Sequence, residues 1–219
     1  MRRSTGWYPP VKRLVDLAVG VVALAPTLAV VGALSVTAVV AHGRPVFFRQ
    51  ERVGRDGHHF TLTKLRTMRT LRDASVGDGA VGRAYAERNR VTSFGAFLRR
   101  THLDELPQLV HILTGDMTLV GPRPLSPGHV AEVASGRRSS VRPGFTCFAQ
   151  LELVEHGYLD KHRQVALDEE YVDRLGPATD LAILWRTATT LLGAAPGRPP
   201  LARLDPSGAG WPEGRRPPG

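Results

Sequence analysis

The most prominent feature of the hydropathy pattern is an apolar run over residues 14–41, in which Asp16 is the only charged residue. The run is longer than the roughly 20 residues that a membrane helix needs. Pro26 lies near its middle, and an internal proline removes a backbone hydrogen bond and kinks or breaks a helix. Each half alone is too short to cross an apolar core of about 30 Å. The pattern therefore predicts a helix, a break at Pro26 and a second helix.

Basic residues flank this run on both sides. They are Arg2, Arg3, Lys12 and Arg13 before it, and Arg44, Arg49, Arg52 and Arg55 after it. Because basic residues favour the cytoplasmic side, we prefer a re-entrant hairpin that keeps both ends there. A kinked single span, a cleaved signal peptide and a buried helix of a soluble core are the alternatives. The run is too long for a signal peptide, and no small-residue cleavage site follows it.

The rest of the pattern predicts a mixture of helices and strands. Residues 46–68 fit a β-hairpin followed by a short strand, with a turn at 55–57. Residues 93–114 have a helical period that Pro107 interrupts and Gly115 closes. The remaining predictions are a polar loop at 69–90, a stiff Pro/Gly loop at 116–128, a helix at 161–175 and an apolar segment at 180–193 on the membrane surface.

These elements divide the chain into four parts. They are a basic segment (1–13), the re-entrant membrane helix (14–41), a cytoplasmic domain (42–193) and a tail (194–219). The tail is expected to be disordered, because 12 of its 26 residues are proline or glycine. The predicted fold class is α+β and mostly helical: a re-entrant membrane helix plus a small cytoplasmic α/β domain with amphipathic interfacial helices.

The composition is strongly basic, with a net charge of +9 and a pI of about 10.7. Such a charge favours anionic partners, namely lipid headgroups, phosphorylated substrates or nucleic acid. Nucleic acid is not expected, because aromatic residues make up only 6% and the basic residues are dispersed. The single cysteine, Cys147, excludes an internal disulfide. Walker A and GxGxxG signatures for nucleotide binding do not occur in the sequence.

An adjacent acidic pair, Asp104 and Glu105, stands shortly before Pro107. Either Thr101 caps a helix in a [ST]-x-x-[DE] pattern, or Asp104 is itself the cap. Both readings place Asp104 near a helix N-terminus, where the dipole favours the ionised carboxylate. An ionised carboxylate can attack phosphorus and form an acyl phosphate, and the neighbouring Glu105 can transfer a proton or bind a metal. Plain helix capping is the alternative, and for an isolated acidic pair it is the commoner one.

Several basic side chains are candidates for phosphate contacts. Arg123 lies in the sequence GPRP (121–124) and Arg142 in VRPG (141–144), and a stiff loop lowers the cost of ordering a guanidinium that binds phosphate bidentately. Lys64 and Arg66 share one face of a predicted strand. Ordinary turns and a solvated strand face are the alternatives. Asp116 follows a predicted helix end, where a carboxylate is disfavoured, so we expect an arginine or magnesium partner for it.

The order of these pieces resembles a known family. The motifs are KRLVD (12–16), the run broken by Pro26, GRPVFFRQ (43–50), RVG (52–54), KLRTM (64–68), LDELPQL (103–109), GDM (115–117), VGPRP (120–124) and RPG (142–144). In this order they are similar to the bacterial sugar transferases, the small monotopic polyprenyl-phosphate phosphoglycosyl transferases. The resemblance covers about residues 11–193.

The resemblance implies a membrane enzyme that moves a sugar-1-phosphate from a UDP-sugar to undecaprenyl phosphate and releases UMP. It implies a ping-pong reaction with Asp104 as the nucleophile. Glu105 would act in acid–base catalysis or metal binding, and the pair would hold Mg²⁺. The implied substrate-binding residues are Lys64, Arg66, Arg123, Pro124 and Arg142. The implied location is the cytoplasmic face of the bacterial inner membrane, and the implied partners are anionic lipids and a second copy of the chain in a homodimer. The implied pathway is glycan or exopolysaccharide assembly.

The sequence departs from the family pattern in a few places. Cys147 and Phe148 stand where a Gly-Trp pair is common, and 151–153 reads Leu-Glu-Leu near the usual Asn-Gly-Arg. Leu65 replaces a common aromatic residue. These departures concern sugar or nucleotide recognition and leave the acidic pair untouched. The alternative functions are a catalytically inactive family member and a basic binding or scaffold protein on the membrane surface.

Overall fold

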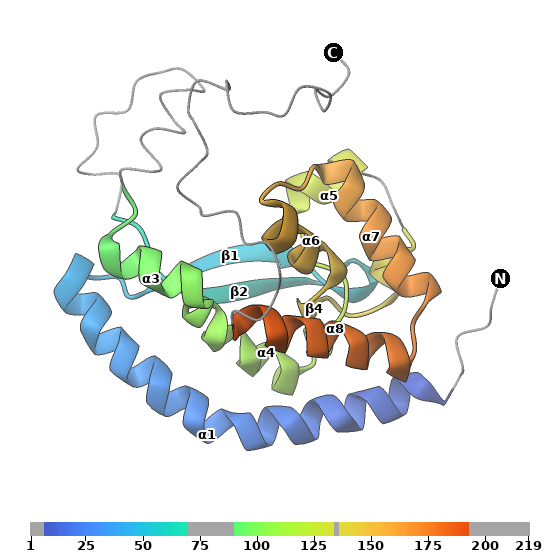
Figure 1. Cartoon of the computed structure of the whole chain (residues 1–219), viewed down its shortest axis with the longest axis horizontal. Helices are drawn as coiled ribbons and strands as arrows, with labels where there is room; N and C mark the ends of the chain where they lie inside the picture. Colours follow the sequence, from blue (N-terminus) through green and yellow to red (C-terminus); the bar gives the residue numbers. More distant parts are fainter. Residues whose placement is uncertain (1–6, 70–89, 134–135, 193–219) are drawn as a thin grey trace, which may run out of the picture.

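The computed structural model describes residues 7–69, 90–133 and 136–192. In this part of the chain, helices predominate, and two small two-stranded sheets lie among them (Figure 1). This arrangement agrees with the mostly helical α+β prediction. Most of the predicted loop at 69–90 and all of the predicted tail at 194–219 lie outside the described residues.

The apolar run forms one helix, α1, which covers Tyr8–His42 and contains Pro26. The predicted break at Pro26 is therefore wrong, because the helix continues through it. A proline costs a helix one hydrogen bond and a steric clash, and a bend relieves the clash without ending the helix. Figure 1 shows α1 bowed, with its concave side toward the rest of the protein. Gly43, at a φ of 68°, ends the helix and donates its N–H to the Val39 carbonyl at 2.9 Å.

Only a narrow stripe of α1 faces the rest of the protein. Asp16, Gly20, Val31 and Ala38 are buried along this stripe. The other faces are also apolar, yet they are exposed, with Leu14, Val22, Val36 and Val40 among the most exposed side chains. The buried helix of a soluble core is thus excluded as an explanation. In the described residues, Tyr8–Ala41 is the one helix long and apolar enough to cross a membrane, with a mean hydropathy of 2.3.

The predicted hairpin is confirmed. Strand β1 (Phe47–Val53) pairs antiparallel with β2 (His59–Leu65), so that Phe47 faces Leu65 and Val53 faces His59. The turn η1 (Arg55–Gly57) contains Asp56 and Gly57 in the left-handed region. After β2, Met68 makes only a single bridge to Val91. One face of the hairpin packs Phe60 and Leu62 against Ile112 and Met117.

The predicted helical segment at 93–114 has three parts. These are α3 (Ser93–Thr101), the 3₁₀ helix η3 (Leu103–Gln108) and α4 (Leu109–Thr114). The interruption was predicted at Pro107, but the chain instead breaks at His102, whose φ is 56°. Pro107 lies inside η3, near the start of the following helix, where its missing N–H does little harm. Gly115, at a φ of 94°, ends α4 as predicted.

Residues 116–128, predicted as a loop, contain a strand that the sequence did not reveal. Strand β3 (Thr118–Val120) pairs in parallel with β4 (Gly144–Thr146), and the short helices α5 (Pro127–Val133) and η4 (Arg138–Ser140) lie between them. The chain segments meet at two glycines. A Cβ on Gly144 would lie 2.1 Å from the backbone N of Gly121, so no larger residue fits there. The two Arg-Pro motifs therefore lie side by side.

Three helices complete the structure. They are α6 (Phe148–His156), which was not predicted, α7 (Lys161–Asp173) and α8 (Pro177–Leu191), which agree with the predicted segments at 161–175 and 180–193. Their core contains Leu151, Tyr171 and Ile183, packed on Val120. The opposite side of α8 exposes large apolar side chains, with Leu181, Trp185 and Leu191 among them.

A buried carboxylate ties the start of α1 to this helical layer. Asp180 accepts hydrogen bonds from Tyr8 at 2.6 Å, Lys12 at 2.5 Å and Tyr171 at 2.9 Å. The three donors come from α1 and α7, and the carboxylate from α8. Because a buried carboxylate is stable only when its oxygens are paired, this network fixes where α1 begins relative to α7 and α8.

Candidate active site

The short helix η3 presents the acidic pair to the interior. In a 3₁₀ helix, residues three apart lie on the same face. Leu103 and Leu106 accordingly pack together into the cluster formed by Val31, Leu65 and Leu98. Asp104 and Glu105 lie between the two leucines in sequence, so they project from the other faces of η3. The apolar anchor thus fixes the direction of both carboxylates.

The capping interpretation of this segment is wrong. No side chain caps η3, and the residue before it is His102. The hydroxyl of Thr101 instead donates to the carbonyl of Phe97 at 2.9 Å, within α3. Asp104 lies in the first turn of η3, as expected, but it is not the N-cap residue, and its carboxyl group bonds to its own backbone N–H. Its burial therefore needs another explanation than helix capping.

Glu105 is held by partners from two other elements. Lys64 of β2 donates to Oε1 at 2.5 Å, and Gln150 of α6 donates to Oε2 at 3.3 Å. Lys64 shares its strand face with Phe60 and Leu62, as the period of two in a strand requires. Burial alone raises the pKa of Glu105, but the charge and hydrogen bond of Lys64, with the charge of Arg123, bring it below its usual value.

Asp104 has the opposite electrostatic setting. It is 8% exposed, and no described side chain forms an ion pair with it. Burial, followed by the negative charge of Glu105, raises the pKa of Asp104 above its usual value, and the charges of Lys64 and His102 oppose the change only in part. The two neighbours thus have pKa values that are pushed apart, which is the arrangement that gives two carboxylates different roles.

Arg123 is the second basic group near Glu105. The charge of Arg123 lowers the pKa of Glu105. The backbone of Arg123 is held by a buried ion pair between Asp168 and Arg138. Asp168 of α7 accepts the Arg123 N–H at 3.1 Å, and Arg138 donates to the Arg123 carbonyl at 2.5 Å and to Asp168 at 2.9 Å. Both ends of one peptide segment are therefore fixed by α7 and η4, and the predicted stiffness of this loop has a tertiary cause.

Two further residues belong to the site, although sequence reasoning gave them no role. Arg52 of β1 donates to the Pro124 carbonyl at 3.2 Å and to Gln50 at 2.6 Å. Burial, followed by the charge of Arg123, lowers the pKa of Arg52, and the charge of Glu105 opposes the change. The position of Arg52 opposite Phe60 in the hairpin is the signal that could have revealed it. Gln150 had no such signal, because α6 was not predicted.

Two predicted phosphate ligands lie elsewhere. Arg66 follows the end of β2, is buried, and donates to the carbonyl of Gly43 at 2.7 Å. Arg142 donates through Nε to the carbonyl of Gly115 at 2.7 Å, and the charges that affect it are those of Arg13, Arg55 and two aspartates. The structure therefore groups Lys64, Arg123 and Pro124 with the acidic pair, and it does not group Arg66 and Arg142 with them. Their roles toward phosphate stay predictions.

The remaining candidates have structural partners. Asp116 accepts from Thr114 at 2.7 Å and lies 3.2 Å from His111, so described side chains other than the predicted arginine are its partners, and the magnesium alternative stays a prediction. Cys147 caps α6 by accepting the N–H of Gln150 at 3.2 Å. Its burial raises the pKa of the thiol to about 12, which rules out a thiolate nucleophile near neutral pH.

A small pocket opens beside Glu105. Its polar lining residues are His102, Glu105, Gln150 and three threonines, Thr146, Thr187 and Thr190. Its apolar lining residues are Phe145, Leu151, Val154 and Leu191. Leu191 also belongs to the exposed apolar side of α8. The lining thus includes both an ionised carboxylate and a residue of the exposed apolar side of α8.

Residues 7–194 match the family described as Bacterial sugar transferase. The chain belongs to this family. It is 36% identical over 183 residues to the uncharacterized sugar transferase EpsL of Bacillus subtilis, covering 83% of this chain and 87% of EpsL. It is also 38% identical to a putative undecaprenyl-phosphate N-acetylgalactosaminyl 1-phosphate transferase of the same organism, over 67% of this chain and 76% of the relative. The resemblance predicted from the motif order is confirmed.

A third relative in this bacterial sugar transferase family is longer. The UDP-glucose:undecaprenyl-phosphate glucose-1-phosphate transferase of Escherichia coli is 34% identical over 80% of this chain and 39% of its own length. The family match at residues 7–194 of the present sequence includes the hairpin, η3 and the two Arg-Pro motifs. The acidic pair and the basic groups around it therefore lie in a sugar transferase domain.

Proposed function

We propose that the protein transfers a sugar-1-phosphate from a UDP-sugar to undecaprenyl phosphate, releases UMP, and begins the assembly of a glycan or exopolysaccharide. The observation that carries the proposal is the pair Asp104–Glu105, in which Lys64 holds one carboxylate ionised while the other is buried with a raised pKa. Membership of the bacterial sugar transferase family and the names of its relatives support the substrate classes.

The first half-reaction uses Asp104 as the nucleophile. Its carboxylate oxygen attacks the phosphorus that carries the sugar, a P–O bond to Asp104 forms, and the P–O bond to UMP breaks, with the electron pair leaving on UMP. Glu105 lies beside Asp104 but is engaged by Lys64 and Gln150, which leaves Asp104 the freer of the two. Arg123 and Lys64 supply positive charge where negative charge builds up on the diphosphate.

The second half-reaction returns the enzyme to its starting state. A phosphate oxygen of undecaprenyl phosphate attacks the same phosphorus, and the bond to Asp104 breaks. The pocket lined by Glu105 and Leu191 supports this step, because its apolar lining residues suit the first isoprene units, while Lys64 and Arg123 near Glu105 supply positive charge for the phosphate. The product is a sugar linked to the lipid through a diphosphate.

The donor set around Asp104 fits Mg²⁺. Magnesium is usually bound by one or two carboxylates together with substrate phosphates, rather than by a cage of protein ligands. Asp104 and Glu105 are such a pair, and no cluster of three metal-ligating side chains exists among the described residues. When bound, the ion would neutralise charge on the diphosphate. Asp104 and Glu105 are the residues that would hold it.

We also infer a re-entrant arrangement of α1 in the bacterial inner membrane, with the rest of the protein on the cytoplasmic face. The exposed apolar side chains of α1, its bend (Figure 1) and the basic residues at both ends support it. Cysteines placed at Thr5 and Arg44 should both resist an impermeant thiol reagent in intact cells. Labelling of one of the two would mean a spanning helix; Cys147 is buried and gives little background.

Transfer from labelled UDP-sugars to undecaprenyl phosphate tests the function directly. Membranes that contain the protein should produce a labelled lipid diphosphate sugar from at least one common UDP-sugar, and EDTA should stop the reaction until Mg²⁺ is restored. If no donor in a broad panel gives product or UMP, the proposed function is wrong. Activity that EDTA leaves intact would remove the metal from the mechanism.

The first half-reaction should lose activity as the pH falls. Asp104 must be ionised to attack, and its raised pKa means that it takes up a proton at a pH above the ordinary aspartate value of about 3.9. We expect kcat/KM for UMP release to fall about tenfold per pH unit below that pKa. In Lys64→Met the opposing positive charge is lost, so the pKa of Asp104 rises further. The acid limb of the pH–activity profile, where activity falls with falling pH, therefore moves to higher pH.

Lys161→Met is the matched control for this shift, since it removes the same charge from the start of α7. Its acid limb should coincide with that of the wild type. A limb that does not move in Lys64→Met would show that another group controls the ionisation.

A further inference from the structure

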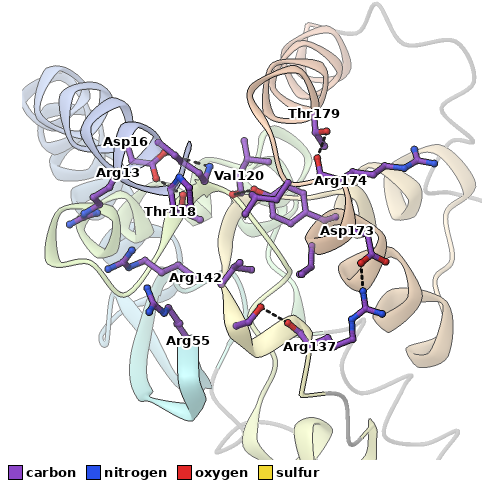
Figure 2. Close-up of a pocket in the computed structure, with 17 residues that line it drawn as sticks. Arg13, Asp16, Arg55, Thr118, Val120, Arg137, Arg142, Asp173, Arg174 and Thr179 are labelled. Atoms are coloured by element: carbon purple, nitrogen blue, oxygen red, sulfur yellow. Dashed lines mark hydrogen bonds and ion pairs between the residues drawn. The ribbon is translucent and has the colours of Figure 1, made fainter. Parts of the chain in front are cut away.

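A second cavity, apart from the acidic pair, is lined by residues that are distant in sequence. It lies between the start of α1, the hairpin turn, the segment before β4 and the end of α7 (Figure 2). Its lining has six basic side chains and two carboxylates, namely Lys12, Arg13, Arg55, Arg137, Arg142 and Arg174 with Asp16 and Asp173. None of the residues grouped with Glu105 lines it. A cavity with this excess of positive charge favours an anionic ligand.

The carboxylates of the cavity are already engaged. Asp16 accepts hydrogen bonds from the hydroxyl of Thr118 and, at 3.3 Å, from the N–H of Leu119, and Asp173 pairs with Arg137. Lys12 is bound to Asp180 at 2.5 Å and lies 3.9 Å from Asp16. Both carboxylates are thus bound to groups other than Arg13 and Arg142, although the charge of Asp16 also acts on Arg142.

Three arginines come together without a matching set of anions. Figure 2 shows Arg13, Arg55 and Arg142 converging on one side of the cavity. Arg13 donates to the carbonyls of Ile112 and Leu113 at 2.5 and 3.2 Å, so neutral groups at the end of α4 hold it. Only Arg55 has a carboxylate partner, Asp56, at 2.9 Å on the exposed turn.

The guanidinium group of Arg142 is fixed through only one of its three nitrogens. Its Nε donates to the carbonyl of Gly115, and among the described residues its two terminal nitrogens have no hydrogen-bond partner. Burial, followed by the positive charges of Arg13 and Arg55, lowers the pKa of Arg142, and the charges of Asp16 and Asp56 oppose the change only in part. An anion between the three guanidinium groups would remove this repulsion, and the guanidinium fork matches phosphate oxygens.

The position of the cavity identifies the source of the phosphate. Arg13 directly precedes Leu14 and Val15, which begin the exposed apolar surface of α1. A basic side chain at the end of an apolar membrane segment lies at the depth of the lipid headgroups. The cavity entrance is then within reach of a lipid phosphate, whereas the fatty chains follow the apolar side of α1.

We propose that Arg13, Arg55 and Arg142 form a binding site for the phosphate group of an anionic membrane lipid, separate from the site around Asp104. The inference rests on contact of α1 with the membrane and does not depend on the transfer reaction. Bound lipid would link α1, the hairpin turn and the segment before β4, and it would fix the height of the domain above the membrane.

Native mass spectrometry of the purified full chain in detergent tests the site. The protein is mixed with phosphatidic acid, phosphatidylglycerol or phosphatidylcholine of the same acyl chains. We expect tighter retention of the two anionic lipids, and about tenfold weaker retention in Arg55→Gln, which corresponds to one charge-assisted hydrogen bond. Arg55 lies on an exposed turn, so this variant keeps the fold, and an unchanged melting temperature verifies that.

Two variants and a soluble probe complete the experiment. Arg142→Lys keeps the charge but loses the fork, so it should also weaken retention, whereas Arg163→Gln at the start of α7 removes an exposed charge outside the cavity and should not. Asp104→Asn should retain lipid normally, which separates this result from the transfer reaction. Equal retention in Arg55→Gln, Arg142→Lys and Arg163→Gln would overturn the proposal.

Calorimetric titration with inorganic pyrophosphate separates the two sources of phosphate. We expect binding much weaker than that of the anionic lipids, since pyrophosphate lacks the acyl chains that follow α1. Tight binding of pyrophosphate that Arg55→Gln weakens, with no preference for anionic lipids, would overturn the assignment to a lipid and identify a soluble phosphate ligand.

Discussion

Replacement of Asp104 by asparagine is expected to abolish the first half-reaction while leaving the fold intact. An amide of the same shape cannot form an acyl phosphate, so no covalent sugar-phosphate adduct accumulates when UDP-sugar is added without acceptor. The loss of turnover should be on the order of 10⁴-fold or more, as for removal of other catalytic nucleophiles. Because Asp104 is buried with a raised pKa, a neutral amide is tolerated there without loss of stability.

The measurement is the intact mass of the protein after incubation with UDP-sugar, together with release of UMP. Wild type should gain the mass of one sugar phosphate, and Asp104→Asn should gain none. Asp160→Asn is the matched control, because Asp160 caps α7 and asparagine caps a helix equally well. An adduct that persists in Asp104→Asn would assign the attack to another residue and refute the ping-pong proposal in this form.

The elements with strong local signals were predictable from the sequence. The apolar length of residues 14–41 revealed α1, and the Arg-Asp-Gly turn between two apolar stretches revealed the hairpin. Gly115 marked the end of α4. Short elements whose pairing is not local were missed. Strands β3 and β4 are three residues each, and they pair only because Gly121 and Gly144 let the backbones approach.

Two errors have the same origin, which is that local rules were applied without tertiary context. Pro26 was expected to break α1, but one lost hydrogen bond does not end a helix that packs along its buried stripe. Pro107 was expected to interrupt the next helical segment, but the leucines of η3 are anchored in the core, and His102 takes the left-handed conformation instead. Tertiary packing decided both positions.

The acidic pair of the site could be predicted from the sequence, but its basic groups could be predicted only in part. Lys64 follows from strand alternation, and Arg123 from the rigidity of its loop. Arg142 has the same local sequence character as Arg123, yet it points to the end of α4 rather than to Glu105. The backbones of the two motifs are adjacent, and the direction of each side chain depends on partners that lie far away in the sequence.

Asp168→Asn is expected to destabilise the protein by about 3–5 kcal/mol, the usual cost of breaking a buried ion pair from one side. Asp168 is 1% exposed and receives two hydrogen bonds from Arg138, at 3.1 and 2.9 Å. A guanidinium cannot lose its proton in a protein, so the variant leaves a buried positive charge without a partner. Urea unfolding of the purified protein measures the change in free energy.

The opposite replacement, Arg138→Met, should cost less. Burial raises the pKa of Asp168 even with Arg138 present, so the orphaned carboxyl can take up a proton and become neutral. Asp173→Asn provides the control, since Asp173 and Arg137 are exposed and such pairs contribute about 0–1 kcal/mol. Equal losses in Asp168→Asn and Asp173→Asn would mean that the buried pair does not stabilise the fold.

Asp168→Asn should also affect catalysis, because Asp168 holds the backbone of Arg123. Asp168 accepts the Arg123 N–H, and Arg138 binds both Asp168 and the Arg123 carbonyl, so this ion pair holds the backbone of the residue whose guanidinium acts on Glu105. Asp168→Asn that remains folded should therefore raise KM for the UDP-sugar more than it lowers kcat, because Arg123 is displaced while Asp104 on η3 stays in place. A fall in kcat alone would instead connect α7 to the chemistry of the acidic pair.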